Sequence, residues 1–141
     1  MEIKIAEKNR KISITNPKEI SDLLQKVLKA EPKSERMKEH FWGIYLNSRN
    51  DIIKIELIGL GILNANLIHP RETYAPALES RAESLIISHN HPSGDTEPSE
   101  DDLAITKRLV EAGKILGVRL QDHIIISEEK GFYSFQEHKL I

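Results

Sequence analysis

Two histidines separated by one residue, with an aspartate eleven residues further on, form the part of this sequence best suited to chemistry. The chain reads Ser-His-Asn-His-Pro-Ser-Gly-Asp from residue 88, and Asp102 lies in the acidic stretch that follows. In an extended backbone, side chains two residues apart project to the same side, so His89 and His91 can converge on one point. Zinc binds imidazole nitrogen and carboxylate oxygen at about 2.0 to 2.2 Å, and three protein ligands plus a water form a catalytic arrangement. We therefore predict that His89, His91 and Asp102 hold one zinc ion and leave one coordination position open to water.

Each part of this pattern also has a simpler interpretation. A His-x-His pair occurs often at strand ends and in loops without any metal. Ser99 and Asp102 fit the start of a helix, where Ser99 is the N-cap and the carboxylate reaches back to it. Negative charge near a helix N-terminus is favourable by roughly 0.3 to 1 kcal/mol per exposed group, which accounts for the neighbouring acids. These interpretations do not explain why the histidines, a tight Pro-Ser-Gly turn and a capped helix meet at one place, and one residue can be both cap and ligand.

The elements around this segment are expected to position its side chains. Residues 84–88 are a short apolar run typical of a strand buried on both faces, and this strand delivers His89. The turn at residues 92–94 can fold the next helix back over the end of that strand. Ser99 opens this helix and Gly117 ends it. Its apolar residues repeat at helical spacing and predict the buried face: Ile105, Leu109, Ala112 and Leu116.

The rest of the chain predicts a mixture of helices and strands without strict alternation. Asn16 and Pro17 favour a helix start, and apolar residues share one face of that helix, which residues 31–34 end: Ile20, Leu23, Leu24, Val27 and Leu28. The other expected elements are a strand or arm at 12–14, a hairpin of 41–46 and 52–58, a linker or strand at 62–68, a helix at 74–82, a strand at 118–126 and a turn at 128–131. This mixture predicts an α+β, layered fold built on a mixed, largely antiparallel sheet flanked by helices.

Length and composition restrict the class of protein. The chain has 141 residues, 39% of them hydrophobic and 30% charged, which suits one globular domain. No apolar run approaches the roughly 18 residues of a membrane span, and the N-terminus lacks a secretory signal. Without cysteine there are no disulfides and no thiolate ligands, and we expect a cytoplasmic protein. The net charge of −2 does not favour nucleic-acid binding.

The motif resembles a known family. The spacing His89-x-His91, Ser99 and Asp102 is similar to the metal motif of the JAMM (MPN+) family, and residues 88–95 closely resemble its bacterial RadC-like branch. Further similar segments extend the resemblance over roughly residues 36–141, namely 39–42, 45–47, 69–72 and 120–124. The resemblance implies the JAMM/MPN architecture, which is cytidine-deaminase-like.

The resemblance also implies a role for each site residue. His89, His91 and Asp102 would be the zinc ligands, Glu39 the acid/base working through the zinc-bound water, and Ser99 a stabiliser of the oxyanion. Zinc lowers the pKa of bound water to about 7, so that a nearby carboxylate can accept its proton and return it to a leaving amine. Taken without the family, Glu39 is more simply an exposed acid at a strand entry and Ser99 a helix cap.

Three functions are therefore left to compare. The first is a zinc metallopeptidase or isopeptidase acting on a protein or peptide. The second is a DNA repair or recombination protein, for example a metal-dependent nuclease, and the third is a scaffold without activity. RadC-like proteins commonly carry a helix-hairpin-helix segment before the metal domain, whereas residues 1–36 predict only an arm and a helix. We therefore expect a stand-alone catalytic domain at 37–141.

Other polar residues receive weaker predictions. Asp122 and His123 form either a pair that orients a metal ligand or, more often for such neighbours, a structural feature of the strand. Arg71 is either a solvated loop residue or a contact for a substrate carboxylate or phosphate. Trp42 is expected in the core, and His40 and His138 receive no role.

Overall fold

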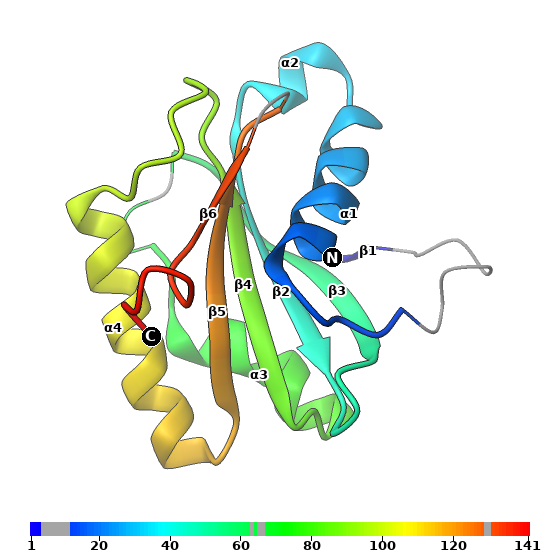
Figure 1. Cartoon of the computed structure of the whole chain (residues 1–141), viewed down its shortest axis with the longest axis vertical. Helices are drawn as coiled ribbons and strands as arrows, with labels where there is room; N and C mark the ends of the chain where they lie inside the picture. The colour runs from blue at the N-terminus through cyan, green and yellow to red at the C-terminus, as the bar shows by residue number, and fades with distance from the viewer. Residues whose placement is uncertain (4–11, 63, 65–66, 129–130) are drawn as a thin grey trace.

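The computed structural model describes residues 1–3, 12–62, 64, 67–128 and 131–141. These residues form a sheet in the order β1-β3-β2-β4-β5-β6, with helices packed against it (Figure 1). The strands are β1 (Glu2–Ile3), β2 (Glu39–Leu46), β3 (Ile52–Gly61), β4 (Ser84–Asn90), β5 (Arg119–Ile126) and β6 (Phe132–Ser134). The helices are α1 (Pro17–Lys29), α2 (Lys33–Arg36), α3 (Pro70–Ser80) and α4 (Glu100–Leu116).

The sheet is mixed but largely antiparallel. Strand β4 pairs with β2 in antiparallel and with β5 in parallel, whereas the other described pairs are antiparallel. Helix α4 forms the crossover that a parallel pair requires. The predicted fold class, α+β with helices flanking a mixed sheet, is confirmed.

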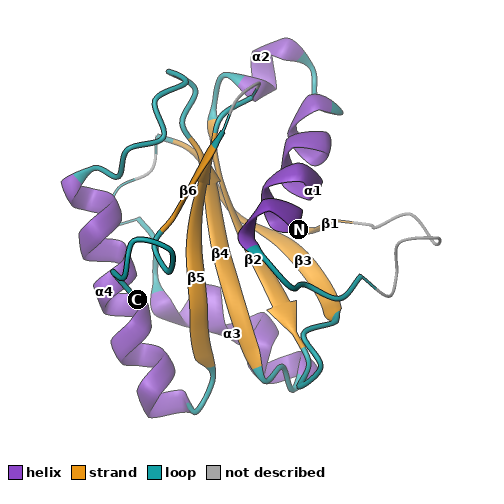
Figure 2. Cartoon of the chain, in the orientation of Figure 1, coloured by secondary structure: helices purple, strands orange, loops and turns teal. Residues whose placement is uncertain are grey.

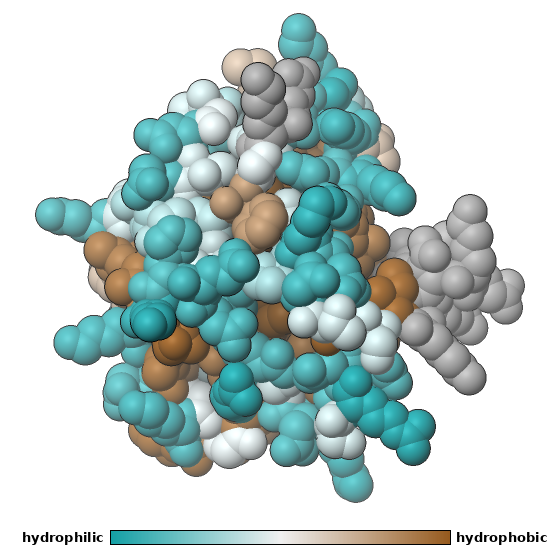
Figure 3. All heavy atoms as spheres, in the orientation of Figure 1, coloured by the Kyte–Doolittle hydropathy of each residue, from teal (hydrophilic) through white to brown (hydrophobic). Residues whose placement is uncertain are grey.

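The sheet separates two hydrophobic cores, each covered by helix (Figure 2). On one face, α1 packs Ile20, Leu24 and Leu28 against the strands, and we call this the α1-side core. On the other face, α3 and α4 cover the α4-side core, which includes Phe41 and Ile87. The outer surface seen in Figure 3 is mainly hydrophilic, and its apolar residues form separate patches.

Local sequence signals explain where the two long helices begin and end. The Asn16 side chain accepts a hydrogen bond from the Glu19 backbone N–H (3.2 Å), and Pro17 follows at the first helical position, as predicted. Ser99 caps α4, and Gly117 ends it with a positive φ of 74°. Glycine adopts this left-handed conformation without steric cost.

Several predicted elements differ from the observed ones. Helix α3 begins at Pro70, four residues before the predicted start, because proline is favoured in the first turn even though His69 supplies no side-chain cap. In the range 62–68, residues 63, 65 and 66 lie outside the described residues, and the others are not in a strand. Ser13 forms only an isolated bridge with Asp51, and the N-terminal strand is β1.

The predicted buried face of α4 is correct at its beginning and wrong at its end. Ile105 and Leu109 are buried, Ala112 is half-buried, and Leu116 is 43% exposed. The buried stripe continues instead through Gly113. Leu116 lies only about 20° from Ile105 around the helix axis, so its exposure comes from its place at the last position of α4 and not from the direction of its side chain.

The predicted arm and helix of residues 1–36 contain α1, which packs directly on the sheet. The boundary between residues 36 and 37 stays a prediction. Among the described residues, no helix combines the length and apolar character needed to cross a membrane.

Candidate metal centre

Strand β4 carries His89 to the end of the central sheet. Its seven residues are all buried, as predicted from their apolar run, and alternate residues face alternate cores. Leu85 and Ile87 belong to the α4-side core, so His89, two residues on, points to the same side. His89 pairs with Phe41 on β2 and with Ile125 on β5, which fixes its backbone from both edges.

A tight turn then brings the chain from β4 to α4. The backbone N–H of Gly94 donates to the carbonyl oxygen of His91 (3.0 Å), and Gly94 has a positive φ of 91°, which glycine adopts readily. The chain returns so that Asp102, in the first turn of α4, lies over the two histidines. The turn therefore folds the start of α4 back over the end of β4, as its Pro-Ser-Gly sequence predicts.

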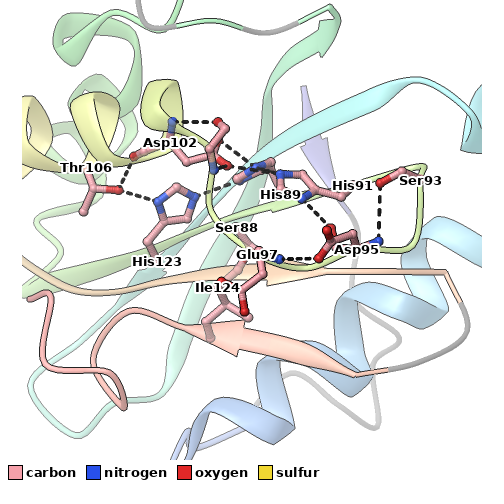
Figure 4. Close-up of polar contacts among 11 residues, drawn as sticks. Ser88, His89, His91, Ser93, Asp95, Glu97, Asp102, Thr106, His123 and Ile124 are labelled. Atoms are coloured by element: carbon pink, nitrogen blue, oxygen red, sulfur yellow. Dashed lines mark hydrogen bonds and ion pairs between the residues drawn. The ribbon is translucent and has the colours of Figure 1, made fainter.

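The two imidazoles and the carboxylate meet at one point (Figure 4). The Nε2 atoms of His89 and His91 are 2.9 Å apart, and each lies 3.1 Å from an oxygen of Asp102. His89 is 3% exposed and Asp102 7%, whereas His91 is half-buried. These three residues could hold a metal ion, and the structure brings together the set that the spacing predicted.

The orientation of the rings fits the chemistry of a metal ligand set. The Nδ1 atom of His91 lies 2.7 Å from the carbonyl oxygen of Asp95, which can only accept, so Nδ1 carries a proton, and in the neutral ring that binds metal Nε2 keeps its lone pair. Ligands at about 2.0 to 2.1 Å in a tetrahedral zinc site lie about 3.3 Å from one another. The observed distances differ from this value by only a few tenths of an ångström, so the site needs little adjustment to accept an ion.

The charges at the site suit a cation. The pKa of His91 is raised, mainly by its hydrogen bond with Asp102. Burial raises the pKa of Asp102, but its hydrogen bonds with His89 and His91 oppose this effect, and the pKa lies well below its ordinary value. Asp102 is therefore a carboxylate near neutral pH, which is the form that binds metal.

Ser99 and Asp102 also form a capping box. The backbone N–H of Asp102 donates to the Ser99 hydroxyl (3.1 Å), and the backbone N–H of Ser99 donates to the Asp102 carboxylate (2.8 Å). The predicted cap is thus present, and it holds the carboxylate toward the histidines. Ser99 is exposed beside the cluster, and its role toward an oxyanion stays a prediction.

Glu39 lies at the edge of the same site. It is the first residue of β2, is half-buried, and lines a hollow of about 550 Å³ together with His91. Its negative charge is one of the causes that raise the pKa of His91. Glu39 is therefore close enough to act electrostatically on the cluster, and its acid/base role stays a prediction.

The residue between the two histidines holds the strand that carries Glu39. The Asn90 side-chain oxygen accepts from the backbone N–H of His40 (2.6 Å), and its amide donates to the carbonyl oxygen of Lys38 (3.1 Å). Asn90 is 1% exposed and binds the backbone on both sides of Glu39. The sequence alone gives Asn90 no role, because nothing in its local pattern indicates a contact 50 residues away.

Asp122 and His123 do not form a pair through their side chains, although the Asp122 carboxylate accepts a hydrogen bond from the His123 backbone N–H (2.8 Å). They are neighbours in β5, so their side chains point to opposite faces. His123 Nε2 lies 2.8 Å from His89 Nδ1, whereas the Asp122 carboxylate accepts from the Ser134 hydroxyl (2.6 Å). His123 Nδ1 also lies 2.6 Å from the hydroxyl of Thr106. Thr106 was not predicted as a site residue, and the signal that could have found it is its place one helical turn after Asp102.

The remaining polar predictions concern residues away from this cluster. Arg71 is exposed and pairs with Glu72 (3.8 Å), in agreement with a solvated residue. Trp42 is buried in the α1-side core as predicted, with the His40 ring stacked on it. The His138 ring stacks on Tyr133.

Comparison with known proteins identifies the family. A family model described as "RadC-like JAB domain" matches residues 14–140. The chain belongs to this family. The resemblance inferred from the motif is thereby confirmed, and the family match includes helix α1 as well as the segment with the histidines.

Similar family members come from bacteria and archaea. A UPF0758 protein of Caldanaerobacter subterraneus subsp. tengcongensis is 46% identical over 131 residues, which are 88% of this chain and 54% of the relative. A UPF0758 protein of Methanococcoides burtonii is 49% identical over 107 residues, covering 76% of this chain and 46% of the relative. A UPF0758 protein of Alkaliphilus oremlandii is 42% identical over 139 residues, covering 99% of this chain and 57% of the relative. The chain spans about half the length of the curated relatives it matches.

Proposed function

We propose that this domain is a zinc-dependent hydrolase of amide bonds, a metallopeptidase or isopeptidase acting on a protein or peptide. The observation that carries the proposal is the convergence of two imidazole nitrogens and a carboxylate within about 3 Å, next to a hollow that Glu39 lines. Two histidines, one carboxylate and an open position are typical of catalytic rather than structural zinc. Neutral imidazole and carboxylate also suit other divalent metals, and zinc is our proposal among them.

The residues of the site would divide the work as follows. His89, His91 and Asp102 would hold the ion, which supplies a nucleophile at neutral pH because it lowers the pKa of a coordinated water to about 7. Glu39 would accept the proton of the attacking water and return it to the leaving amine. The Ser99 hydroxyl would donate a hydrogen bond to the oxyanion that forms on the substrate carbonyl.

The surroundings of the hollow support a polypeptide substrate. Ile62 is 86% exposed and Met37 is 69% exposed, and both line the hollow beside Glu39 and His91. Apolar side chains next to polar catalytic groups offer contacts to the side chains of an extended peptide. The proposal covers this domain only, because the curated relatives are about twice as long.

The substitution Glu39→Gln tests the proposed acid/base. We expect the variant to bind about one zinc per chain and to lose roughly 10²- to 10⁴-fold in hydrolysis, since Gln cannot accept the proton. Elemental analysis and a screen of peptide and isopeptide substrates measure the two quantities. Glu79→Gln, an exposed carboxylate on α3, is the matched control and should behave like the wild type. Full turnover in Glu39→Gln would remove Glu39 from the mechanism, and wild-type protein without bound metal would remove the zinc site.

The DNA-associated alternative stays a prediction from the sequence. The near-neutral charge does not favour it, and binding to duplex or branched DNA that falls steeply with salt would support it. The scaffold alternative would be supported by a protein that binds no zinc, nickel, manganese or iron.

A further inference from the structure

A fully buried histidine lies directly behind the metal-ligand cluster. His123, on β5, is 0% exposed, and its ring lies between His89 and Thr106 (Figure 4). Its ring stacks on Phe135 with centroids 4.6 Å apart, and Phe41 contacts it edge-on at 6.2 Å. Aromatic packing on two sides fixes the plane of the ring, so each ring nitrogen has one defined neighbour.

The hydroxyl of Thr106 decides which nitrogen of His123 carries the proton. Thr106 Oγ1 lies 2.7 Å from the carbonyl oxygen of Asp102, one turn earlier in α4. A carbonyl oxygen can only accept, so the Thr106 hydroxyl donates its proton there. The Nδ1 atom of His123, 2.6 Å from the same hydroxyl, must then be the donor in that contact.

The proton positions of His89 follow from those of His123. Neutral imidazole carries one N–H, so His123 Nε2 has a lone pair and accepts. His89 Nδ1, 2.8 Å away, therefore donates to it. The remaining nitrogen of His89, Nε2, keeps its lone pair and faces His91 and Asp102 at about 3 Å. This order of hydrogen bonds leaves His89 Nε2 free to bind an ion, which would replace the hydrogen bond between His89 Nε2 and the Asp102 carboxylate.

We propose that His123 and Thr106 are positioning residues that fix the tautomer of His89, so that Nε2 is always the ligand nitrogen. The inference rests on the proposed metal centre. The tautomers of both histidine ligands are then fixed in the same way: His91 Nδ1 donates to the Asp95 carbonyl oxygen, and His89 Nδ1 donates to His123 Nε2. A ligating histidine whose second nitrogen donates to a fixed acceptor binds metal more tightly.

One hydroxyl connects two ligands in this arrangement. Thr106 holds the carbonyl group of Asp102 through its proton and the tautomer of His89 through His123. Without the hydroxyl, the proton of His123 can move from Nδ1 to Nε2. His123 would then donate to His89 Nδ1, and the proton of His89 would sit on its own Nε2, where it blocks metal binding. Valine has nearly the same shape as threonine but no hydroxyl. Thr106→Val therefore removes the group that fixes the tautomer of His123, with little change in packing.

Zinc affinity tests the inference, measured by competition with a chromophoric chelator. Thr106→Val should weaken zinc binding about 10- to 100-fold. Thr106→Ser, which keeps the hydroxyl, should bind zinc with an affinity close to that of the wild type. Thr73→Val is the matched control, since Thr73 is also buried in a helix and its hydroxyl donates to the carbonyl oxygen of His69 one turn back (3.1 Å), with no hydrogen bond from that hydroxyl to a histidine ring among the described residues. Unchanged zinc affinity in Thr106→Val would overturn the inference, whereas a wild type that binds no zinc would overturn the proposed function itself.

A spectroscopic measurement reads the tautomers directly and needs no activity. Ring ¹⁵N chemical shifts of the wild type at mildly alkaline pH should show protons on Nδ1 of both His89 and His123. In Thr106→Val the His123 signals should shift toward the other tautomer. Wild-type protein with the proton of His123 on Nε2 would overturn the inference, whatever the zinc affinities.

Discussion

The carboxylate of Asp102 serves both the helix and the candidate metal centre. One oxygen faces His89, and the other lies near His91 and accepts from the backbone N–H of Ser99. A capping box usually needs only a side-chain acceptor at this position, and glutamate or glutamine is the common choice. The shorter aspartate keeps the carboxylate close to the helix backbone, where it meets both the Ser99 N–H and the histidines.

Asn90 allows a prediction at the same scale. Asn90→Ala leaves the backbone N–H of the buried residue His40 without its side-chain acceptor and removes one hydrogen bond to the Lys38 carbonyl oxygen, which still contacts the His40 ring (2.8 Å), so we expect a loss of about 2 kcal/mol in the free energy of unfolding. Zinc affinity should change little, because Asn90 offers no ligand atom, while turnover should fall because the start of β2 that carries Glu39 loosens. Denaturant unfolding and zinc competition measure these effects.

The substitution Asn90→Asp separates the two hydrogen bonds. Aspartate still accepts from His40 but repels the carbonyl oxygen of Lys38, so this variant should also be destabilised. Wild-type stability in both variants would contradict the role assigned to Asn90.

The sequence predicts single residues where a local pattern specifies them. His89, His91 and Asp102 could be assigned because strand alternation and one turn determine where they lie. Asn90 and Thr106 could not, because their partners at Lys38, His40 and His123 are distant in sequence and become neighbours only once the sheet order is known.

At the scale of elements, Ser99 at the start of α4 is both the cap of the helix and a proposed catalytic residue. Ser99→Ala should lower the free energy of unfolding by about 1 kcal/mol, because the backbone N–H of Asp102 loses its acceptor. If the hydroxyl also stabilises an oxyanion, turnover should fall roughly 10²- to 10³-fold with zinc still bound. Thermal unfolding and peptide hydrolysis measure the two effects.

A second variant distinguishes the two roles of Ser99. Ser99→Thr keeps both the cap and the hydroxyl and should retain most of both properties. If Ser99→Ala loses only stability while its turnover matches that of the wild type, Ser99 is a cap alone.

The elements themselves follow the sequence closely where capping residues and apolar periodicity agree. Helices α1 and α4 and strands β2, β4 and β5 all lie within a few residues of their predicted positions. Helix α3, predicted at 74–82, lies at Pro70–Ser80, because Pro70 starts it at a position that proline favours, and Pro76 lies inside it. The surrounding packing tolerates this proline, since Tyr74 and Ala77 beside it are buried in the α4-side core.

At the scale of the whole molecule, two hydrophobic cores pack against the sheet, and their residues do not include the proposed metal ligands. Removing zinc with a chelator should therefore leave a folded protein, unlike small zinc domains that unfold without metal. At free zinc 100-fold above the dissociation constant, the ion adds about 2.7 kcal/mol, so chelation should lower Tm by about 5 to 15 °C. Scanning calorimetry with circular dichroism measures both. His89→Ala should show no zinc-dependent shift, and unfolding of the wild type on chelation at room temperature would contradict this account.

The position of β4 between β2 and β5 has a consequence for exchange kinetics. Amides of a strand that is paired along both edges exchange with deuterium only when much of the domain opens, whereas an exposed loop exchanges through local fluctuations. His89 belongs to the first kind of segment, and residues 92–95, which are exposed, to the second. An ion could therefore enter and leave past this loop many times during the lifetime of one folded molecule, while the strand that holds it stays closed.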